Sequence, residues 1–139
     1  MEQKLDNIQQ HMKSNNLRLI QIPGGEILTD KVYDIFTNKM KVNINKSVIT
    51  AIYRVGRTSD TKPRHVLVSF TDNSIKMATY NKKKFLKGTK IVIKEDLTPH
   101  RLKVVKAASD KFGFKNVWTV NGNIFVKTDK GVEKFSVNE

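Results

Sequence analysis

The sequence predicts an α+β protein of two parts, and three observations support this prediction. Segments typical of strands and helices over residues 16–96 follow the order strand, helix, strand, strand, helix, strand. Residues 97–139 are then typical of one helix and three short strands. Between these parts, the segment KGTKIVIKEDLTPHR at 87–101 ends an apolar strand and opens a capped helix, which indicates a domain boundary.

Residues 1–15 are expected to form a helix, because Leu5, Ile8 and Met12 recur at spacings of three and four residues. The apolar seam is narrow, and two heptads are fewer than the number that identifies a coiled coil. The pattern therefore fits two alternatives equally well. The helix is either the remnant of a coiled coil that would oligomerise the chain through these three residues, or a helix that docks on the next domain.

In the first domain, 16–96, alternating and apolar runs predict strands, and apolar residues at helical spacing predict two helices. The sequence Pro23-Gly24-Gly25 ends the first strand. The predicted strands are 16–22, 47–55, 65–70 and 90–95, and the predicted helices begin at Thr29 or Asp30 and at Asp72 or Asn73.

This order of elements is the split βαβ arrangement, a sandwich in which two helices cover one face of a four-stranded antiparallel sheet. The RNA recognition motif uses this plan and stacks bases on aromatic side chains of its two central strands. Here the outward positions of those strands are Arg18, His65, Leu67 and Ser69. Because none of these residues is aromatic, we expect basic side chains to carry most of the binding.

The second domain, 97–139, is expected to pack one helix on a three-stranded antiparallel sheet. Thr98 caps the predicted helix, Pro99 is its first residue, and Gly113 ends it. A domain of this size is marginal alone. The predicted apolar face of the helix consists of Leu102, Val105, Ala108 or Ser109, and Phe112.

The three strands of the second domain begin with a predicted hairpin. Asn121-Gly122 lies between two alternating runs, which is typical of a type I′ turn. A third strand is expected at 132–137. Trp118 is expected to anchor the core of this small domain, with base stacking as the alternative role.

The composition indicates an anionic partner. The chain has 26 Lys and Arg against 13 Asp and Glu, a net charge of +13, so nucleic acid is the first candidate and an anionic membrane surface the second. Residues 81–106 carry nine basic and two acidic residues, whereas residues 1–48 carry seven and five. Arg64 and Arg101 are expected to be exposed. The basic side chains predicted to contact nucleic acid are Arg18, Arg54, Arg57, Lys62, Arg64, His65, Lys90, Arg101, Lys103 and Lys106.

The sequence contains no recognisable catalytic or metal-binding pattern. It has no cysteine, and its three histidines are scattered without ligand spacing. A phosphate-binding glycine loop and a nucleophile elbow are also missing. We therefore expect neither an enzyme nor a cofactor or metal. Without a long apolar run or a signal peptide, we expect an intracellular protein of the cytoplasm or nucleus, with no membrane partner.

Several segments, taken in order, resemble one known family. They are NLRLIQIP (16–23), AIYRVGR (51–57), PRHVLVSF (63–70), and KGTKIVIKEDLTPHR (87–101) followed by NVWTVNGNIFV (116–126). Together they are similar to the RNA-binding protein encoded by the first reading frame of LINE-type non-LTR retrotransposons, and to the baculovirus few-polyhedra (FP) protein. The last segment is most similar to the C-terminal domain of the FP-like proteins.

The resemblance implies an RNA recognition motif without stacking aromatics (16–96) and an FP-type C-terminal domain (97–139). It implies that a basic cleft between them holds single-stranded nucleic acid. Our first hypothesis is therefore a protein that binds single-stranded RNA, and secondarily single-stranded DNA, without sequence specificity. Family members act as nucleic-acid chaperones that coat element RNA, and they form trimers through an N-terminal coiled coil. Tyr53, Arg54 and Arg64 match family positions implicated in RNA binding.

This chain departs from the family pattern in two places. Some relatives carry an arginine pair in the helix after the junction, where this chain has Val105-Lys106. The coiled coil is almost absent as well. The alternative function, which the resemblance to the FP protein and the apolar seam of Leu5, Ile8 and Met12 indicate, is that of a viral FP-like structural protein that acts in assembly through protein–protein contacts.

Overall fold

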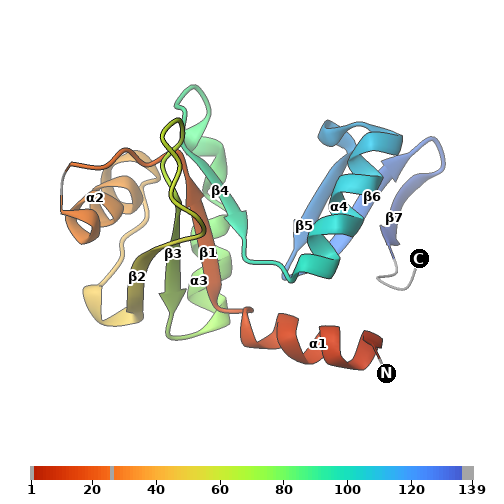
Figure 1. Ribbon diagram of the computed structural model, residues 1–139, viewed down its shortest axis with the longest axis horizontal. Coiled ribbons are helices and arrows are strands. Elements are labelled where there is room, and N and C mark those ends of the chain that lie inside the picture. Colours follow the sequence, from red (N-terminus) through yellow and green to blue (C-terminus); the bar gives the residue numbers. More distant parts are fainter. Residues whose placement is uncertain (1, 26, 136–139) are drawn as a thin grey trace. The chain divides into compact units, whose positions relative to one another are not determined.

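Figure 1 shows a computed structural model of the chain, which describes residues 2–25 and 27–135. In this part the protein is α+β, with four α-helices and two antiparallel sheets of four and three strands. The helices are α1 (Glu2–Met12), α2 (Leu28–Asp34), α3 (Asn73–Tyr80) and α4 (Pro99–Phe112). The strands are β1 (Asn16–Ile20), β2 (Ile49–Val55), β3 (His65–Phe70), β4 (Val92–Glu95), β5 (Val117–Val120), β6 (Asn123–Thr128) and β7 (Gly131–Phe135).

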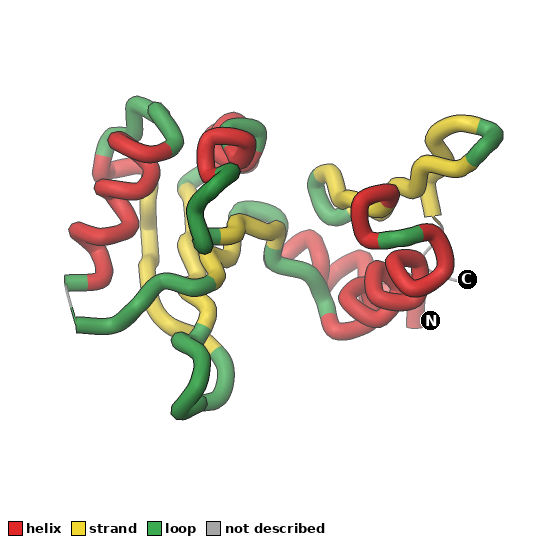
Figure 2. Tube along the Cα trace, turned by 90° about the horizontal axis from the view of Figure 1, so that it is seen from above, coloured by secondary structure: helices red, strands yellow, loops and turns green. Residues whose placement is uncertain are grey.

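The chain divides into two compact units, and each combines helices with strands (Figure 2). The central unit consists of residues 15–94, and the terminal unit combines residues 1–14 with 95–139. Helix α1 therefore belongs with α4 and the three-stranded sheet, although β1 follows it directly in the sequence.

The central unit has the order of elements that the sequence predicts: strand, helix, strand, strand, helix, strand. Its strands lie in the order β2-β3-β1-β4, so β1 and β3 are the central pair. Apolar residues from both helices pack on one face of this sheet, where the rings of Phe36 and Phe70 are 6.0 Å apart. The fully buried side chains of this core include Leu17, Leu19, Ile22, Val32, Phe36, Met40, Val66 and Val68.

Helix α2 is prolonged by a π-helical turn, Ile35–Lys39. The apolar residues predicted for one face of this helix nevertheless all reach the core, because Val32, Ile35, Phe36 and Met40 are buried. Helix α3 starts where the sequence predicts, with Asp72 Oδ1 accepting a hydrogen bond from the Ile75 N–H at 3.0 Å.

In the terminal unit, the predicted start and end of α4 are confirmed. Thr98 Oγ1 accepts a hydrogen bond from the Arg101 N–H at 3.2 Å, Pro99 is the first helical residue, and Gly113 follows the last. The predicted apolar face is confirmed at Ala108 and wrong at Leu102. The buried residues of the helix are Arg101, Val104 and Ala108, and Leu102 is half exposed.

The β5–β6 hairpin has the predicted type I′ turn, with φ of 52° at Asn121 and 81° at Gly122. Ile124 and Val126 are buried. Trp118 is opposite Phe125, so both rings lie on the other face of the sheet, where they are half-buried and stack at 6.3 Å. The prediction that Trp118 anchors the core is therefore wrong. Of the predicted third strand, residues 136 and 137 lie outside the described chain.

Candidate nucleic-acid interface

One face of the central sheet is opposite the face on which α2 and α3 pack, and we call it the open face. Arg18 on β1 is opposite Leu67 on β3, which is opposite Tyr53 on β2. Directly paired residues of antiparallel strands point to the same side, so these three side chains form one row. By alternation, the residues of the open face are Asn16, Arg18, Ile20, Ala51, Tyr53, Val55, His65, Leu67, Ser69, Val92 and Lys94.

The middle of this row is an apolar side chain between a ring and a guanidinium. Tyr53 is 49% exposed, whereas Leu67 is only 5% exposed. Leu67 has the outward orientation that the sequence predicts, yet it is buried, and its direct cross-strand neighbours are Arg18 and Tyr53. The aromatic group of the open face thus comes from the edge strand β2 and not from the two central strands.

The open face also carries positive charge. Burial lowers the pKa of His65, and the positive charges of Arg18 and Lys94 lower it further. His65 is therefore neutral at pH 7. Lys94 was not among the residues predicted to contact nucleic acid. Alternation with the buried Ile93 is the signal that could have placed it on this face.

Arg54, one of the basic residues predicted to contact nucleic acid, does not lie on the open face. It is opposite Val66, a core residue, so its side chain starts from the helix-covered face. Its Nη1 donates a hydrogen bond to the Arg64 carbonyl at 2.8 Å, and its Nη2 donates to the Pro23 carbonyl at 3.1 Å. Strict alternation from Ile52, which packs on the core, would have given this orientation.

The other predicted contact residues lie in different parts of the molecule. Arg57, Lys62 and Arg64 are exposed in the connection between β2 and β3, and Lys90 is exposed just before β4. Lys103 and Lys106 are exposed on α4 in the terminal unit. Of the predicted residues, the open face brings together Arg18, Tyr53 and His65.

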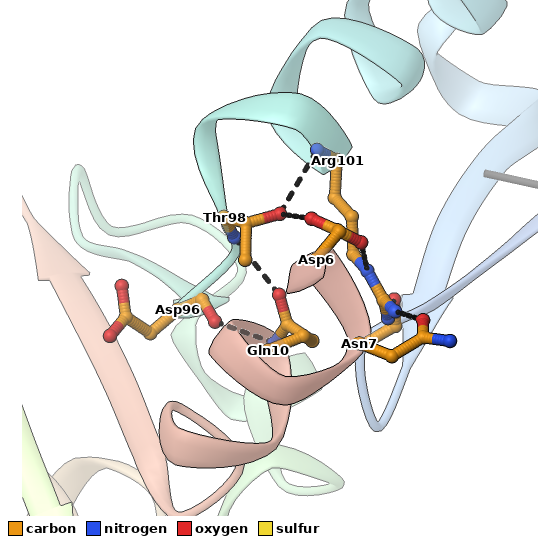
Figure 3. A network of polar contacts seen from close by, with 7 residues as sticks. Asp6, Asn7, Gln10, Asp96, Thr98 and Arg101 are labelled. Atoms are coloured by element: carbon orange, nitrogen blue, oxygen red, sulfur yellow. Dashed lines mark hydrogen bonds and ion pairs between the residues drawn. The ribbon is translucent and has the colours of Figure 1, made fainter. Parts of the chain in front are cut away.

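Arg101 was predicted to be exposed, and this is also wrong, because it is 7% exposed and bonded on every side (Figure 3). Its Nε donates to Asp6 Oδ2 at 2.9 Å, its Nη2 to Asn7 Oδ1 at 2.8 Å, and its Nη1 to the Gly122 carbonyl at 2.8 Å. A guanidinium held in this way has a structural role and does not present its charge to a strand.

Arg101 belongs to a buried polar cluster in the terminal unit. Thr98 Oγ1 donates to Asp6 Oδ1, and the Thr98 N–H donates to Gln10 Oε1 at 2.9 Å. Gln10 Nε2 in turn donates to the Asp96 carbonyl at 2.9 Å. These bonds join α1 to the first turn of α4 (Figure 3). We call Asp6, Asn7, Gln10, Asp96, Thr98 and Arg101 the polar cluster.

The ionisation of Asp6 is part of this arrangement. Burial alone would raise its pKa, but hydrogen bonds from Thr98 and Arg101 and the positive charge of Arg101 outweigh burial, so the pKa is lowered. Gly122 packs closely against the polar cluster. A Cβ at this position would come within 3.0 Å of Gln10 and 3.2 Å of Arg101 Nη1. The turn that requires glycine for its backbone also requires it for this close approach.

Helix α1 therefore packs through its polar side. Leu5, Ile8 and Met12, the predicted apolar seam, are 56%, 53% and 77% exposed. The prediction that α1 docks on the domain after it, residues 16–96, is wrong. Helix α1 is part of the terminal unit, and its apolar seam faces outward. The oligomerising role of the seam stays a prediction.

Two other findings limit the kinds of site in the described residues. Residues 2–25 and 27–135 hold no group of three or more His, Cys, Asp or Glu side chains that could bind a metal ion. None of the helices in these ranges combines the length and apolar character needed to cross a bilayer. Neither a model of a known protein family nor a curated protein sequence matches the chain.

Proposed function

We propose that the protein is a non-sequence-specific binder of single-stranded RNA, and that its central unit is an RRM-like domain that holds the strand on the open face. The observation that carries this proposal is the half-exposed ring of Tyr53, in one row with Arg18 on that face. Any of the bases can stack on an aromatic ring, and nearby cations neutralise the phosphates of any sequence, so neither contact selects a sequence.

The chemistry of this face favours a strand over a duplex. In a duplex the flat faces of the bases are already stacked on one another, so a protein ring can reach them only in an unpaired strand. Neither stacking nor phosphate neutralisation requires the ribose 2′-OH, so single-stranded DNA is the second ligand. Binding of this kind suits a nucleic-acid chaperone that coats the RNA of a retroelement, the role that the sequence resemblance implies.

Fluorescence anisotropy of a labelled single-stranded oligonucleotide over a series of salt concentrations tests the proposal. We expect log K to fall linearly with log salt, with a slope of about −0.7 for each phosphate neutralised. A duplex of the same sequence should bind more weakly. Absence of binding at low salt, or a flat salt dependence, would contradict the proposal.

The second candidate is an assembly protein that acts through protein–protein contacts, and the exposed seam of α1 favours it. The test must keep the polar side of α1, since deleting the helix would also remove Asp6 and Gln10 from the polar cluster. Sedimentation should therefore compare the natural chain with a Leu5→Ser, Ile8→Ser, Met12→Ser variant. Concentration-dependent assembly that the variant loses, without affinity for nucleic acid, would favour this candidate.

A further inference from the structure

A large pocket in the central unit lies away from the open face. Its volume is about 1010 Å³, at the upper end of the range of small-molecule sites. It is lined by α2 with its π-helical turn, by the end of the β2–β3 connection, and by the segment before β4. Its lining therefore belongs to the helix-covered side of the sheet, where none of the residues of the open face takes part.

The pocket has an excess of positive charge. Four lysines line it, Lys31, Lys39, Lys62 and Lys90, against the two carboxylates of Asp30 and Asp34. Lys31 is oriented by a hydrogen bond from its Nζ to the Pro23 carbonyl at 3.2 Å. The other three lysines are exposed, and among the described residues none of them forms an ion pair.

The walls of the pocket are held in place by the fold. Arg54 donates to the carbonyls of both Pro23 and Arg64, and so ties the segment after β1 to the end of the β2–β3 connection. At the same rim, Gln21 has a φ of 69°, a left-handed conformation that a residue with a side chain rarely adopts. A strained backbone conformation persists only where the surrounding structure holds it in place. Residues with such a conformation are found disproportionately at ligand sites.

The rest of the lining is suited to a particular kind of anion. Pro23, Ile35, Pro63 and Ile91 give the pocket apolar surface, and the two carboxylates can accept hydrogen bonds from hydroxyl and amino groups. A nucleotide offers all three partners: phosphate for the lysines, ribose hydroxyls for the carboxylates, and a base for the apolar walls. Inorganic phosphate or an acidic peptide offers fewer of them.

We propose that this pocket binds a nucleoside monophosphate unit, with its phosphate on the lysines and its base on the apolar wall. Such a unit is present both in a free mononucleotide and at the phosphorylated end of a nucleic-acid strand. This inference does not depend on strand binding by the open face, because the two sites share no residue.

The test titrates the whole chain with adenosine 5′-monophosphate and, separately, with inorganic phosphate, and follows backbone amide shifts. In parallel, anisotropy compares one oligonucleotide with a 5′-phosphate and with a 5′-hydroxyl. We expect shifts at the pocket with the nucleotide that exceed those with phosphate, or an affinity about tenfold higher for the phosphorylated end. The first result identifies a free nucleotide as the source, and the second identifies a strand end.

The Lys39→Gln, Lys90→Gln variant should abolish whichever response is seen, and the Lys41→Gln, Lys115→Gln variant, which loses the same charge outside the pocket, should retain it. Three outcomes would overturn the proposal. They are the absence of both responses, an equal loss in the two variants, and a response to inorganic phosphate as large as that to the nucleotide. Unchanged thermal unfolding of both variants ensures that each result concerns binding.

Discussion

The polar cluster of the terminal unit and the open face of the central unit each contain an arginine, and the surroundings of the two arginines differ. In the polar cluster, Arg101 is buried and three of its nitrogens donate to protein oxygens. On the open face, Arg18 is in one row with the half-exposed Tyr53, and Leu67 lies between them. Arg101 therefore has a structural role, whereas a contact between Arg18 and nucleic acid is our proposal.

The largest expected effect is a loss of stability in the terminal unit when the polar cluster is broken. Asp6→Ala leaves the buried guanidinium of Arg101 without its carboxylate, which should lower the free energy of unfolding of the terminal unit by about 3–5 kcal/mol. Trp118 is the only tryptophan of the chain and lies in this unit, so its fluorescence during chemical denaturation reports the loss. Asp110→Ala, which removes an exposed carboxylate from α4, is the matched control and should change little.

The next effect is a loss of affinity for a single strand that leaves the stability of the fold unchanged. Tyr53→Ala should weaken binding of a single strand by about 1–3 kcal/mol, because one base loses its stacking partner. Tyr53→Phe keeps the ring and should bind as the natural protein does. Anisotropy measures both variants. Equal losses in the two would mean that the hydroxyl and not the ring makes the contact, and the stacking role would be wrong.

A third change tests the charges of the open face. In the Arg18→Gln, Lys94→Gln variant, two fewer phosphates are neutralised, so the salt slope of binding should become shallower by about 1.4. The Lys115→Gln, Lys130→Gln variant loses the same charge from exposed sites of the terminal unit and should keep the natural slope. If both variants changed the slope equally, binding would depend on net charge alone.

The smallest expected effect is a pH dependence caused by His65. Its pKa is lowered in the folded state, so the unfolded chain takes up the proton first, and the stability of the central unit should fall as pH drops below 7 through the usual histidine range. A bound polyanion favours the protonated form, so affinity should rise over the same range. Anisotropy at pH 7.5 and 5.5 measures this, and His65→Gln should remove it.

The comparison also explains how far the sequence could predict the structure. Features set by neighbouring residues were predictable, such as the Thr98 cap, the Asn121-Gly122 turn and the order of the elements of the central unit. The face on which a strand residue lies is predictable by alternation. Strict alternation predicts that Arg54 is on the helix-covered face and that Lys94 is on the open face.

The polar cluster could not be predicted, because its partners are distant in the sequence. Asp6 and Arg101 are separated by 95 positions, and no local pattern marks either residue as buried. A basic residue near a helix start is ordinarily exposed, so its usual assignment is a surface charge. The pocket beside α2 escaped prediction for the same reason, since its lysines come from three separate segments.

The division of the chain into units affects how it is made on the ribosome. Helix α1 is synthesised before the central unit, but its partners at Asp96, Thr98 and Arg101 appear only after the whole central unit. At 11 residues it is too short to be a stable helix in isolation, so it must wait for them. Synthesis that stops just after residue 94 would release a complete central unit preceded by a segment that has nothing to fold against.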